Sequence, residues 1–444
     1  MVNPDGVFNS LEKGISQRQN SMYTDDDGDG RINEDGWDDL NGDGQITYFR
    51  YKDANGRFYI DDEDPRIMVQ LQRGQKTEKQ RYMMIMEDKD NDGDGKRGED
   101  PERGIDLNRN FGEGWFRDDG FAGGSGDYAF SAPETRAVAE FLTNHTNVLM
   151  GQNFHTSGGF TYRPMGTAPH TRLHPKDVAV LDFIMGKKYL EIIGQEVPSA
   201  WQKPQDLDTF KEELKKTSKN KYAIQRGYVL PRGWRVSYNE DQDRRYSYGM
   251  ATDWMYAQYG VFAITTELWN PAQDIPGFPK IEGDDARIQR EREMMKYIDA
   301  HYGGKLFVPW TAFKHPTLGE GEIGGLLPAY RNNALPGDPL RKVCEEHWQF
   351  ELFRAGLLPE VVITSAKAEV LYTTGSAKES TASQDGDSVT IKKGRSKGSL
   401  KVVKITANIA NQGKLATHIG RGAQLAGNRE DIVWLLGDRD KITF

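Results

Sequence analysis

Two residues of the chain follow apolar segments and are expected at the ends of strands. His155 follows the apolar run of residues 148–154, and Glu267 follows the run of residues 261–266. A histidine at a sheet edge can bind a metal ion, and a buried carboxylate has a raised pKa that suits a general base. The ordinary alternatives are a structural histidine with satisfied hydrogen bonds and an exposed strand end.

A third candidate is an amide beside a guanidinium, in the segment Asp106-Leu-Asn-Arg-Asn-Phe111. Arg109 offers a planar fork of donors and Asn108 adds another, which makes the pair suitable for holding a carboxylate. Taken alone, this pair is a weak signal.

Three short acidic loops in the first hundred residues share one pattern, an oxygen-bearing side chain on alternate residues before a glycine. EF-hand-type loops wrap a hard cation in this way, because the glycine permits the sharp turn. The candidate ligands are Asp25, Asp27, Asp29, Asp39, Asn41, Asp43, Asp90, Asp92 and Asp94.

The loops depart from the EF-hand pattern at the twelfth position, where a bidentate glutamate is expected. Gly36, Arg50 and Pro101 stand there instead. The acidic residues available as substitutes are Glu34, Asp35, Glu99 and Asp100. We expect Ca²⁺ binding by at least one loop, and the alternative is a set of solvated Asp-Gly turns.

Composition narrows the class of protein. A chain of 444 residues suggests two or three units. The 58 Lys and Arg residues against 67 Asp and Glu residues do not favour a nucleic-acid partner. No apolar run approaches the roughly 18 residues of a membrane span. The single cysteine, Cys344, excludes an internal disulfide framework.

The elements that must position these residues are predicted from periodicity. Residues 104–303 alternate between helical and strand patterns, which favours an α/β sheet with its site at the strand ends. The segment Ser131-Ala-Pro-Glu134 predicts a capping box at a helix start. Residues 304–358 are expected to be a linker with a helical connection, and residues 359–444 a small β-sandwich that is cut short at Phe444.

Several motifs occur together in one order: Asn3-Pro-Asp-Gly6, Asp106-Leu-Asn-Arg-Asn-Phe111, Phe154-His-Thr-Ser157, Asp253-Trp254 and Thr266-Glu-Leu268. Through them, residues 2 to about 303 resemble the zinc metallocarboxypeptidases of the carboxypeptidase A type. The resemblance implies a mixed-sheet, phosphorylase/hydrolase-like α/β domain over residues 1–303, with the acidic loops as an insertion at about residues 22–100. Such an insertion resembles that of some secreted bacterial members, which implies an extracellular or periplasmic setting.

The resemblance also implies roles for single residues. His155 would be the third zinc ligand, and Glu267 the general base that activates the zinc-bound water at the C-terminal peptide bond of a peptide or protein substrate. Asn108 and Arg109 would hold the terminal carboxylate, and Arg18 would stabilise the oxyanion.

Three further positions are less firmly aligned. Tyr246 matches the family's mobile tyrosine best, with Tyr248 as the alternative, and Arg50 is a second candidate for the oxyanion arginine. Thr252 corresponds to the side-chain specificity position and indicates no preferred terminal residue.

The family's first two zinc ligands come from a His-x-x-Glu motif upstream of Asn3-Pro-Asp-Gly6, and none of the eight histidines is followed by glutamate at that spacing. We expect this chain to be an N-terminally incomplete part of a zinc carboxypeptidase. The alternatives are an inactive homologue that still binds carboxylates, or a calcium-dependent surface or adhesion module.

Overall fold

The computed structural model divides the 444-residue chain into two compact units, residues 1–351 and 352–444. No described helix is long and apolar enough to cross a membrane. The structure describes residues 3–23, 25, 28–72, 74–102, 104–117, 124–165, 173–181, 184–185, 188–194, 234–236, 248–269, 275, 281, 285–373, 381–385, 388–392 and 401–425.

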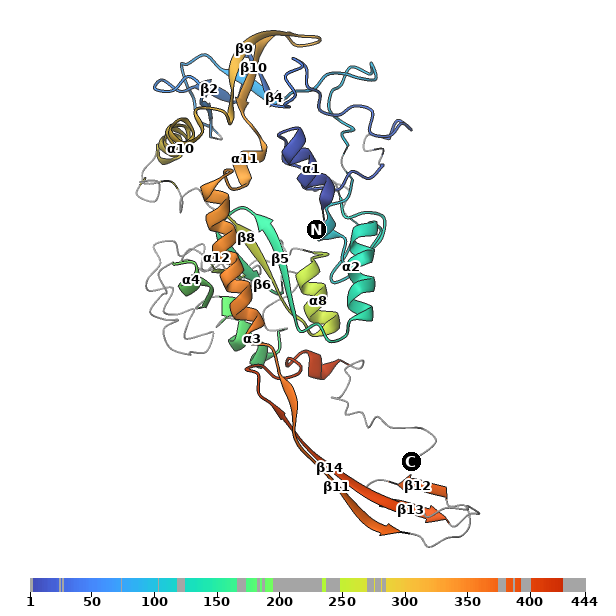
Figure 1. Ribbon diagram of the computed structural model, residues 1–444. Coiled ribbons are helices and arrows are strands. Elements are labelled where there is room, and N and C mark those ends of the chain that lie inside the picture. The colour runs from blue at the N-terminus through green and yellow to red at the C-terminus, as the bar shows by residue number, and fades with distance from the viewer. Residues whose placement is uncertain are drawn as a thin grey trace. The chain divides into compact units, whose positions relative to one another are not determined.

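A four-stranded mixed sheet in the first unit carries two of the candidate residues, His155 and Glu267 (Figure 1). The order of its strands is β5 (Met150–Thr156), β8 (Phe262–Leu268), β6 (Phe160–Arg163) and β7 (Trp234–Val236). β5 and β8 are parallel, as are β6 and β7, whereas β6 and β8 are antiparallel. β8 is buried over its first five residues, which explains its continuous apolar sequence. The expected mixed α/β class is confirmed.

Helix α8 (Ala251–Tyr259) borders this sheet, and helix α2 (Pro133–Asn144) packs beside α8 (Figure 1). α8 contacts both β5 and β8. Its residue Trp254 joins Phe111 and Leu142 in one buried cluster, so the segment after Asp106 is packed between the two helices. α8 ends at Gly260, whose φ of 64° is the left-handed conformation typical of a helix C-terminus.

The capping box predicted for α2 does not form, because the N-cap is Ala132 and no side chain of its own caps the helix. Asn110 takes this role from another segment. Its Oδ1 accepts hydrogen bonds from the Ala132 N–H at 3.1 Å and the Thr135 hydroxyl at 2.7 Å, and its Nδ2 donates to Ser131 Oγ at 2.8 Å. Residues 106–111 are thereby fixed to the start of α2.

A second sheet of six antiparallel strands lies in the same unit. In spatial order the strands are β3 (Met68–Gln70), β2 (Phe58–Ile60), β4 (Tyr82–Met86), β1 (Tyr48–Lys52), β10 (Gly319–Leu326) and β9 (Phe307–His315). The sheet therefore combines strands from the acidic insertion with strands from the segment that was expected to be a linker.

The glycines of β10 explain why its strand pattern is weak in the sequence. A Cβ at Gly321 would lie 2.4 Å from the Phe49 ring, and Gly324 has a φ of 147° beside a break in register. Glycine normally weakens a strand, but here it permits close approach of the neighbouring strand. Because glycine is typical of turns, the glycine-rich sequence of β10 does not indicate a strand.

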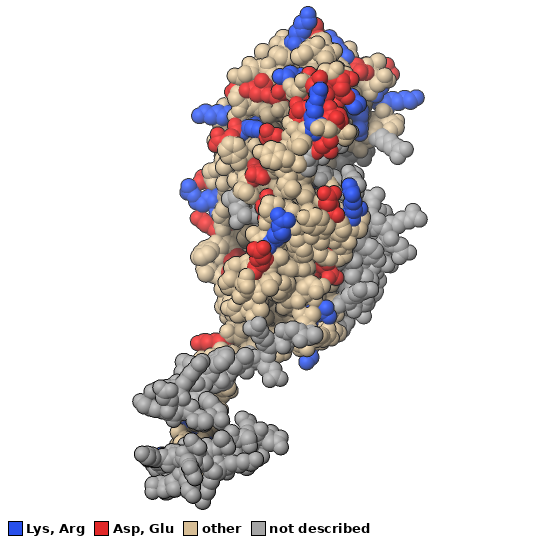
Figure 2. All heavy atoms as spheres, turned by 90° about the vertical axis from the view of Figure 1, so that its right-hand side faces the viewer, with Lys and Arg blue, Asp and Glu red and all other residues tan. Residues whose placement is uncertain are grey.

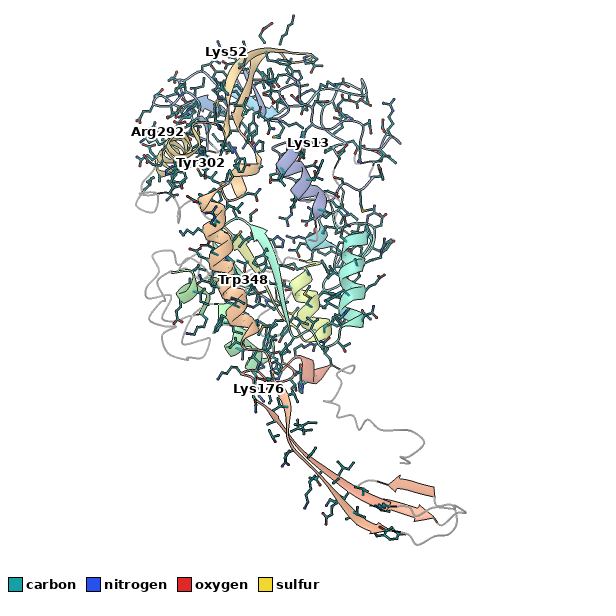
Figure 3. The ribbon with its side chains drawn as sticks, viewed as in Figure 1. Lys13, Lys52, Lys176, Arg292, Tyr302 and Trp348 are labelled. Atoms are coloured by element: carbon teal, nitrogen blue, oxygen red, sulfur yellow. The ribbon has the colours of Figure 1, made fainter. Side chains whose placement is uncertain are left out.

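Helix α10 (Ala286–Tyr302) packs against this part of the unit, with Arg292 and Tyr302 along its length (Figure 3). Its buried residues Met295 and Ile298 join Leu306 and Phe307 in one core cluster. The helical connection expected within residues 304–358 corresponds to α12 (Asp338–Ala355). The remaining described helices of this unit are α1 (Pro4–Glu12), α3 (Pro175–Leu181), α4 (Tyr189–Ile192), α11 (Ala329–Asn332) and η1 (Leu107–Arg109), and α12 (Asp338–Ala355) extends across residue 351.

The described strands of the second unit form two antiparallel pairs. β11 (Val361–Thr373) pairs with β14 (Lys401–Asn411), and β12 (Thr381–Asp385) pairs with β13 (Ser388–Lys392). A short 3-10 helix, η5 (Gly422–Gln424), follows. The β-sandwich expected for residues 359–444 stays a prediction.

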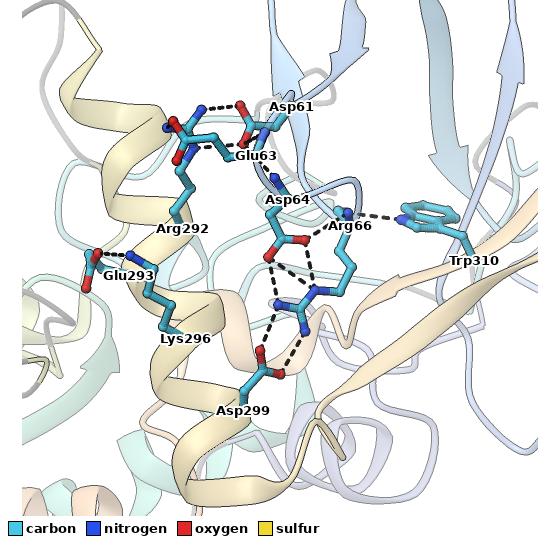
Figure 4. A network of polar contacts seen from close by, with 9 residues as sticks. All are labelled: Asp61, Glu63, Asp64, Arg66, Arg292, Glu293, Lys296, Asp299 and Trp310. Atoms are coloured by element: carbon cyan, nitrogen blue, oxygen red, sulfur yellow. Dashed lines mark hydrogen bonds and ion pairs between the residues drawn. The ribbon is translucent and has the colours of Figure 1, made fainter.

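An ion-pair network ties the loop between β2 and β3 to α10 (Figure 4). Arg66 donates to Asp64 at 2.7 Å and to both oxygens of Asp299 at 2.7 and 2.8 Å. Arg292 donates to both oxygens of Asp61 at 2.6 and 2.7 Å. The Arg66 guanidinium holds the pKa of Asp64 and of Asp299 below the usual range.

We predict that Arg66→Met destabilises the fold at pH 7 by about 1–2 kcal/mol, since both carboxylates are partly solvent-screened. Carboxylates with a lowered folded pKa stabilise the fold above their unfolded pKa of about 4, and this contribution disappears as the pH falls through the folded value. The difference from wild type should therefore shrink between pH 5 and pH 3 in urea unfolding. Lys296→Met, which removes an exposed pair with Glu293, is the control. An equal loss at pH 7 and pH 3 would contradict the assignment.

Candidate functional site

The register of β5 and β8 brings two predicted residues together. His155 lies directly opposite Glu267 in the parallel pair, and Phe160 of β6 lies opposite Glu267 on its other side. Paired residues of neighbouring strands point to the same face of a sheet. The imidazole and the carboxylate therefore share one face, one residue before the ends of both strands.

Arg18 is held beside this region by Asp106. Asp106 is the N-cap of η1 and accepts a hydrogen bond from the Asn108 N–H at 3.1 Å. Its carboxylate is buried and forms a 2.5 Å ion pair with Nε of Arg18. The Asn3-Pro-Asp-Gly6 motif contributes to this position. It forms the start of α1, with Asn3 as the N-cap, and Asn3 Nδ2 donates to the Arg18 carbonyl at 3.0 Å. The sequence motif contains Asp106, but the sequence did not predict its ion pair with Arg18.

Asn108 connects the turn to the histidine and to α8. Its Oδ1 accepts a hydrogen bond from the Ala251 N–H at 3.1 Å. This orients the side chain so that Nδ2 lies 3.5 Å from Nε2 of His155. An amide donor is thus placed next to the imidazole.

Arg109 lies between its own turn and residues 248–249. Its Nη1 donates to the Asn108 carbonyl at 2.7 Å, and its guanidinium carbon lies 5.6 Å from the centre of the Tyr248 ring. Gly249 has a φ of 57°, and a Cβ there would lie 2.1 Å from the Arg109 carbonyl oxygen. Only glycine fits this approach. Tyr246, the preferred tyrosine candidate, lies outside the described residues, and Tyr248 is buried.

The surroundings of His155 disfavour its charged form. Burial lowers the pKa of His155 to about 4, and the positive charges of Arg18 and Arg109 act in the same direction, against the Asp106 carboxylate. The imidazole is therefore neutral at pH 7, the form that binds metal ions. The same two guanidinium groups make this face favourable for an anion.

Among the residues that the structure describes, none completes a zinc site with His155. A catalytic zinc ion takes three protein ligands. Within the described part of the chain, every group of three His, Cys, Asp or Glu residues close enough to share an ion lies in the acidic loops, and none contains His155. His155 is thus a single zinc-ligand candidate at this face.

Two other residues considered from the sequence are buried elsewhere. Arg50 in β1 pairs with Glu322 at 2.8 Å and lies 4.1 Å from the centre of the Trp310 ring. It belongs to the second sheet, which leaves Arg18 as the better candidate for the arginine near His155. Thr252, in the first turn of α8, is only 2% exposed.

The acidic loops form compact Asx-type turns. Asp25, Asp39 and Asp90 each accept hydrogen bonds from the N–H groups three and five residues later, at 2.5–3.0 Å. Figure 2 shows acidic side chains gathered, with interspersed basic ones, at the end of the first unit where these loops lie. Asp27 lies outside the described residues.

Asn20 and Asn110 were not identified from the sequence, although both support the site. Asn20 accepts a hydrogen bond from the Ile105 N–H at 2.9 Å and donates to Glu134 at 3.0 Å. Glu134 was expected to cap its own helix. Asn110 belongs to the same motif as Asn108 and Arg109, and its position just after them was the available signal.

One comparison with known proteins identifies a family for this chain. A family model described as zinc carboxypeptidase matches residues 1–282, which include all the candidate residues discussed above. No curated protein matches the chain.

Two of the similar solved structures are a crystal structure of thrombin activatable fibrinolysis inhibitor and the bovine inhibitor in complex with tick carboxypeptidase inhibitor. The first is 18% identical with a TM-score of 0.25, over 41% of this chain and 36% of that one. The second is 18% identical with a TM-score of 0.24, over 41% and 49%. This chain therefore spans less than half the length of either structure.

We predict that Asn110→Ala destabilises the first unit by about 2–4 kcal/mol, because buried donors and acceptors at the start of α2 lose their partner. Asn144→Ala, at the exposed end of the same helix, should cost less than about 0.5 kcal/mol. Urea unfolding followed by tryptophan fluorescence measures both. Equal costs for the two variants would show that Asn110 does not hold the turn to the helix.

Proposed function

Because the chain belongs to the zinc carboxypeptidase family, we propose that it carries the carboxylate-binding and general-base part of a metallocarboxypeptidase-type hydrolase. The substrates are the C-termini of peptides or proteins. Members of this family are peptide hydrolases that use zinc.

One observation carries the proposal: Glu267 lies beside a neutral His155 on a face where Arg18 and Arg109 exert positive charge. A carboxypeptidase must hold the terminal carboxylate of its substrate and activate a water molecule at the adjacent carbonyl. Guanidinium groups serve the first task, and a carboxylate serves the second. Both kinds of group meet at one sheet edge.

Each residue then has a stated task. Asn108 and Arg109, with Tyr246, hold the terminal carboxylate, and Arg18 stabilises the oxyanion that forms at the scissile carbonyl. Glu267 accepts a proton from the attacking water. The described residues supply a single zinc ligand, His155, so only binding and proton transfer are assigned to them.

Within the described residues, no group of possible metal ligands contains His155, and this observation favours a second candidate, an inactive homologue that binds carboxylates. Release of terminal amino acids from a peptide in the presence of Zn²⁺ separates the two. Release that is lost in Glu267→Gln supports the hydrolase, and peptide binding without any release supports the inactive homologue.

We also propose that the acidic loops bind Ca²⁺. The alternating oxygen side chains and the turns closed by Asp25, Asp39 and Asp90 support this. Weak calcium sites suit calcium-rich fluid, which accords with an extracellular or periplasmic setting.

We predict that a peptide with a free C-terminal carboxylate binds at least about tenfold more tightly than its C-terminal amide, because charge-assisted hydrogen bonds contribute about 1.5–3 kcal/mol. Arg109→Met should remove this difference. Arg341→Met, which alters an exposed arginine of α12, should keep it. Glu267→Gln should also keep it, because this residue is assigned to proton transfer. Isothermal titration of the full chain measures all four proteins, and equal affinity of wild type for acid and amide would exclude the proposal.

A further inference from the structure

Carboxylates from the first and third acidic loops converge on Asp92. Two oxygens bound to one Ca²⁺ at about 2.4 Å lie no more than about 4.8 Å apart. Among the described residues, three groups meet this limit, since their ligand oxygens lie within 4.8 Å of one another: Asp29, Glu34 and Asp92; Asp35, Asp90 and Asp92; and Asp92, Asp94 and Glu99. All three contain Asp92, and two combine residues of both loops.

Asp35 is a buried member of this cluster that lacks a full set of partners. Its side chain is 1% exposed, and its Oδ1 lies 3.4 Å from Asn91 Nδ2, but its Oδ2 has no hydrogen-bond partner among the described residues. The same holds for Oε2 of Glu34 and both carboxylate oxygens of Glu99. A buried carboxylate without compensation is costly, and a divalent cation in contact with it provides the compensation.

The carboxylates also crowd one another. Burial, followed by the charges of Asp35 and Asp94, raises the pKa of Glu99 to about 7. Two cationic contacts to this cluster among the described residues come from the surface: Arg31, 57% exposed, lies 3.2 Å from Asp92, and Lys96, 66% exposed, lies 2.8 Å from Asp94. Exposed pairs of this kind contribute little, so a bound cation can replace them at small cost.

Backbone pairing holds the two loops together independently of any ion. Asp35 pairs with Asp100, and Trp37 pairs with Asp88, in isolated antiparallel bridges. The Asn33 N–H also donates to the Asp100 carboxylate at 2.7 Å. The ligands of the two loops are therefore placed in advance, which lowers the entropic cost of binding.

The second loop differs from the other two. Asp39 accepts hydrogen bonds from Gly42, Asp43 and Gly44 of its own loop, as Asp25 and Asp90 do from theirs, so the difference lies in the contacts between loops. Within the described part of the chain, none of the three carboxylate groups includes a residue of this loop. The second loop therefore provides an internal control for Ca²⁺ binding by a single loop.

We propose that the first and third loops form one shared calcium centre of two ions, in which the two carboxylate oxygens of Asp92 bridge the ions. Glu34, Asp35 and Glu99 supply the oxygens that the missing twelfth-position glutamates would have provided. This inference rests on the proposal that the loops bind Ca²⁺. It differs in that residues of two loops bind the ions together, instead of each loop binding its own ion.

The test is Ca²⁺ binding by the calcium-depleted full chain, measured by equilibrium dialysis. Asp92→Asn should weaken two ions together, by roughly tenfold or more, because both lose a charged ligand. Asp43→Asn, the same change in the second loop, should leave this pair of ions in place. If Asp92→Asn weakens one ion only, the shared centre is wrong although calcium binding stands. If wild type binds no Ca²⁺ at millimolar concentration, the parent proposal fails as well.

A second measurement uses the wild-type chain and so does not depend on the folding of a variant. Tb³⁺ and Eu³⁺ replace Ca²⁺ in oxygen sites, and two ions that share a carboxylate lie within about 5 Å. Efficient Tb³⁺-to-Eu³⁺ energy transfer is expected. Binding of both lanthanides without transfer would overturn the shared centre.

Discussion

The parallel pairing of β5 with β8 is the constraint on which the candidate site depends. It places His155 directly opposite Glu267 on one face of a sheet. The two strands are far apart in the sequence, so only their pairing brings the histidine and the carboxylate together. A slip of one residue in this register would turn one of the two side chains to the opposite face and separate the base from the imidazole.

The remaining groups reach this face through one short turn. Residues 106–110 hold Arg18 through Asp106, place the Asn108 amide beside His155, and attach to α2 through Asn110. The turn is thus fixed by buried polar contacts, which rigidify a site when each group is satisfied. Substrate recognition and proton transfer are in this way assigned to separate elements that meet at one edge.

Apolar runs identified both strand ends in the sequence. β8 is apolar because it is buried over its first five residues, whereas β5, which was also expected to be buried, is only half-buried and exposes Phe154. The predictions that were wrong concern features that depend on contacts between residues far apart in the sequence. The capping box at Ser131 is replaced by Asn110, and β10 was hidden by its glycines, of which Gly321 lies against the Phe49 ring. The acidic loops were considered one at a time, whereas their carboxylates gather between loops through backbone pairing at Asp35 and Asp100. Local patterns carry no information on such partners.

The central claim is that a substrate's C-terminus lies against His155. The most direct measurement is the nuclear Overhauser effect between histidine ring protons of the isotope-labelled chain and a bound, unlabelled peptide, with His155 assigned from a His155→Gln variant. The account predicts contacts from the His155 ring to the last two residues of the peptide. Contacts confined to internal residues of the peptide, or to other histidines, would contradict it.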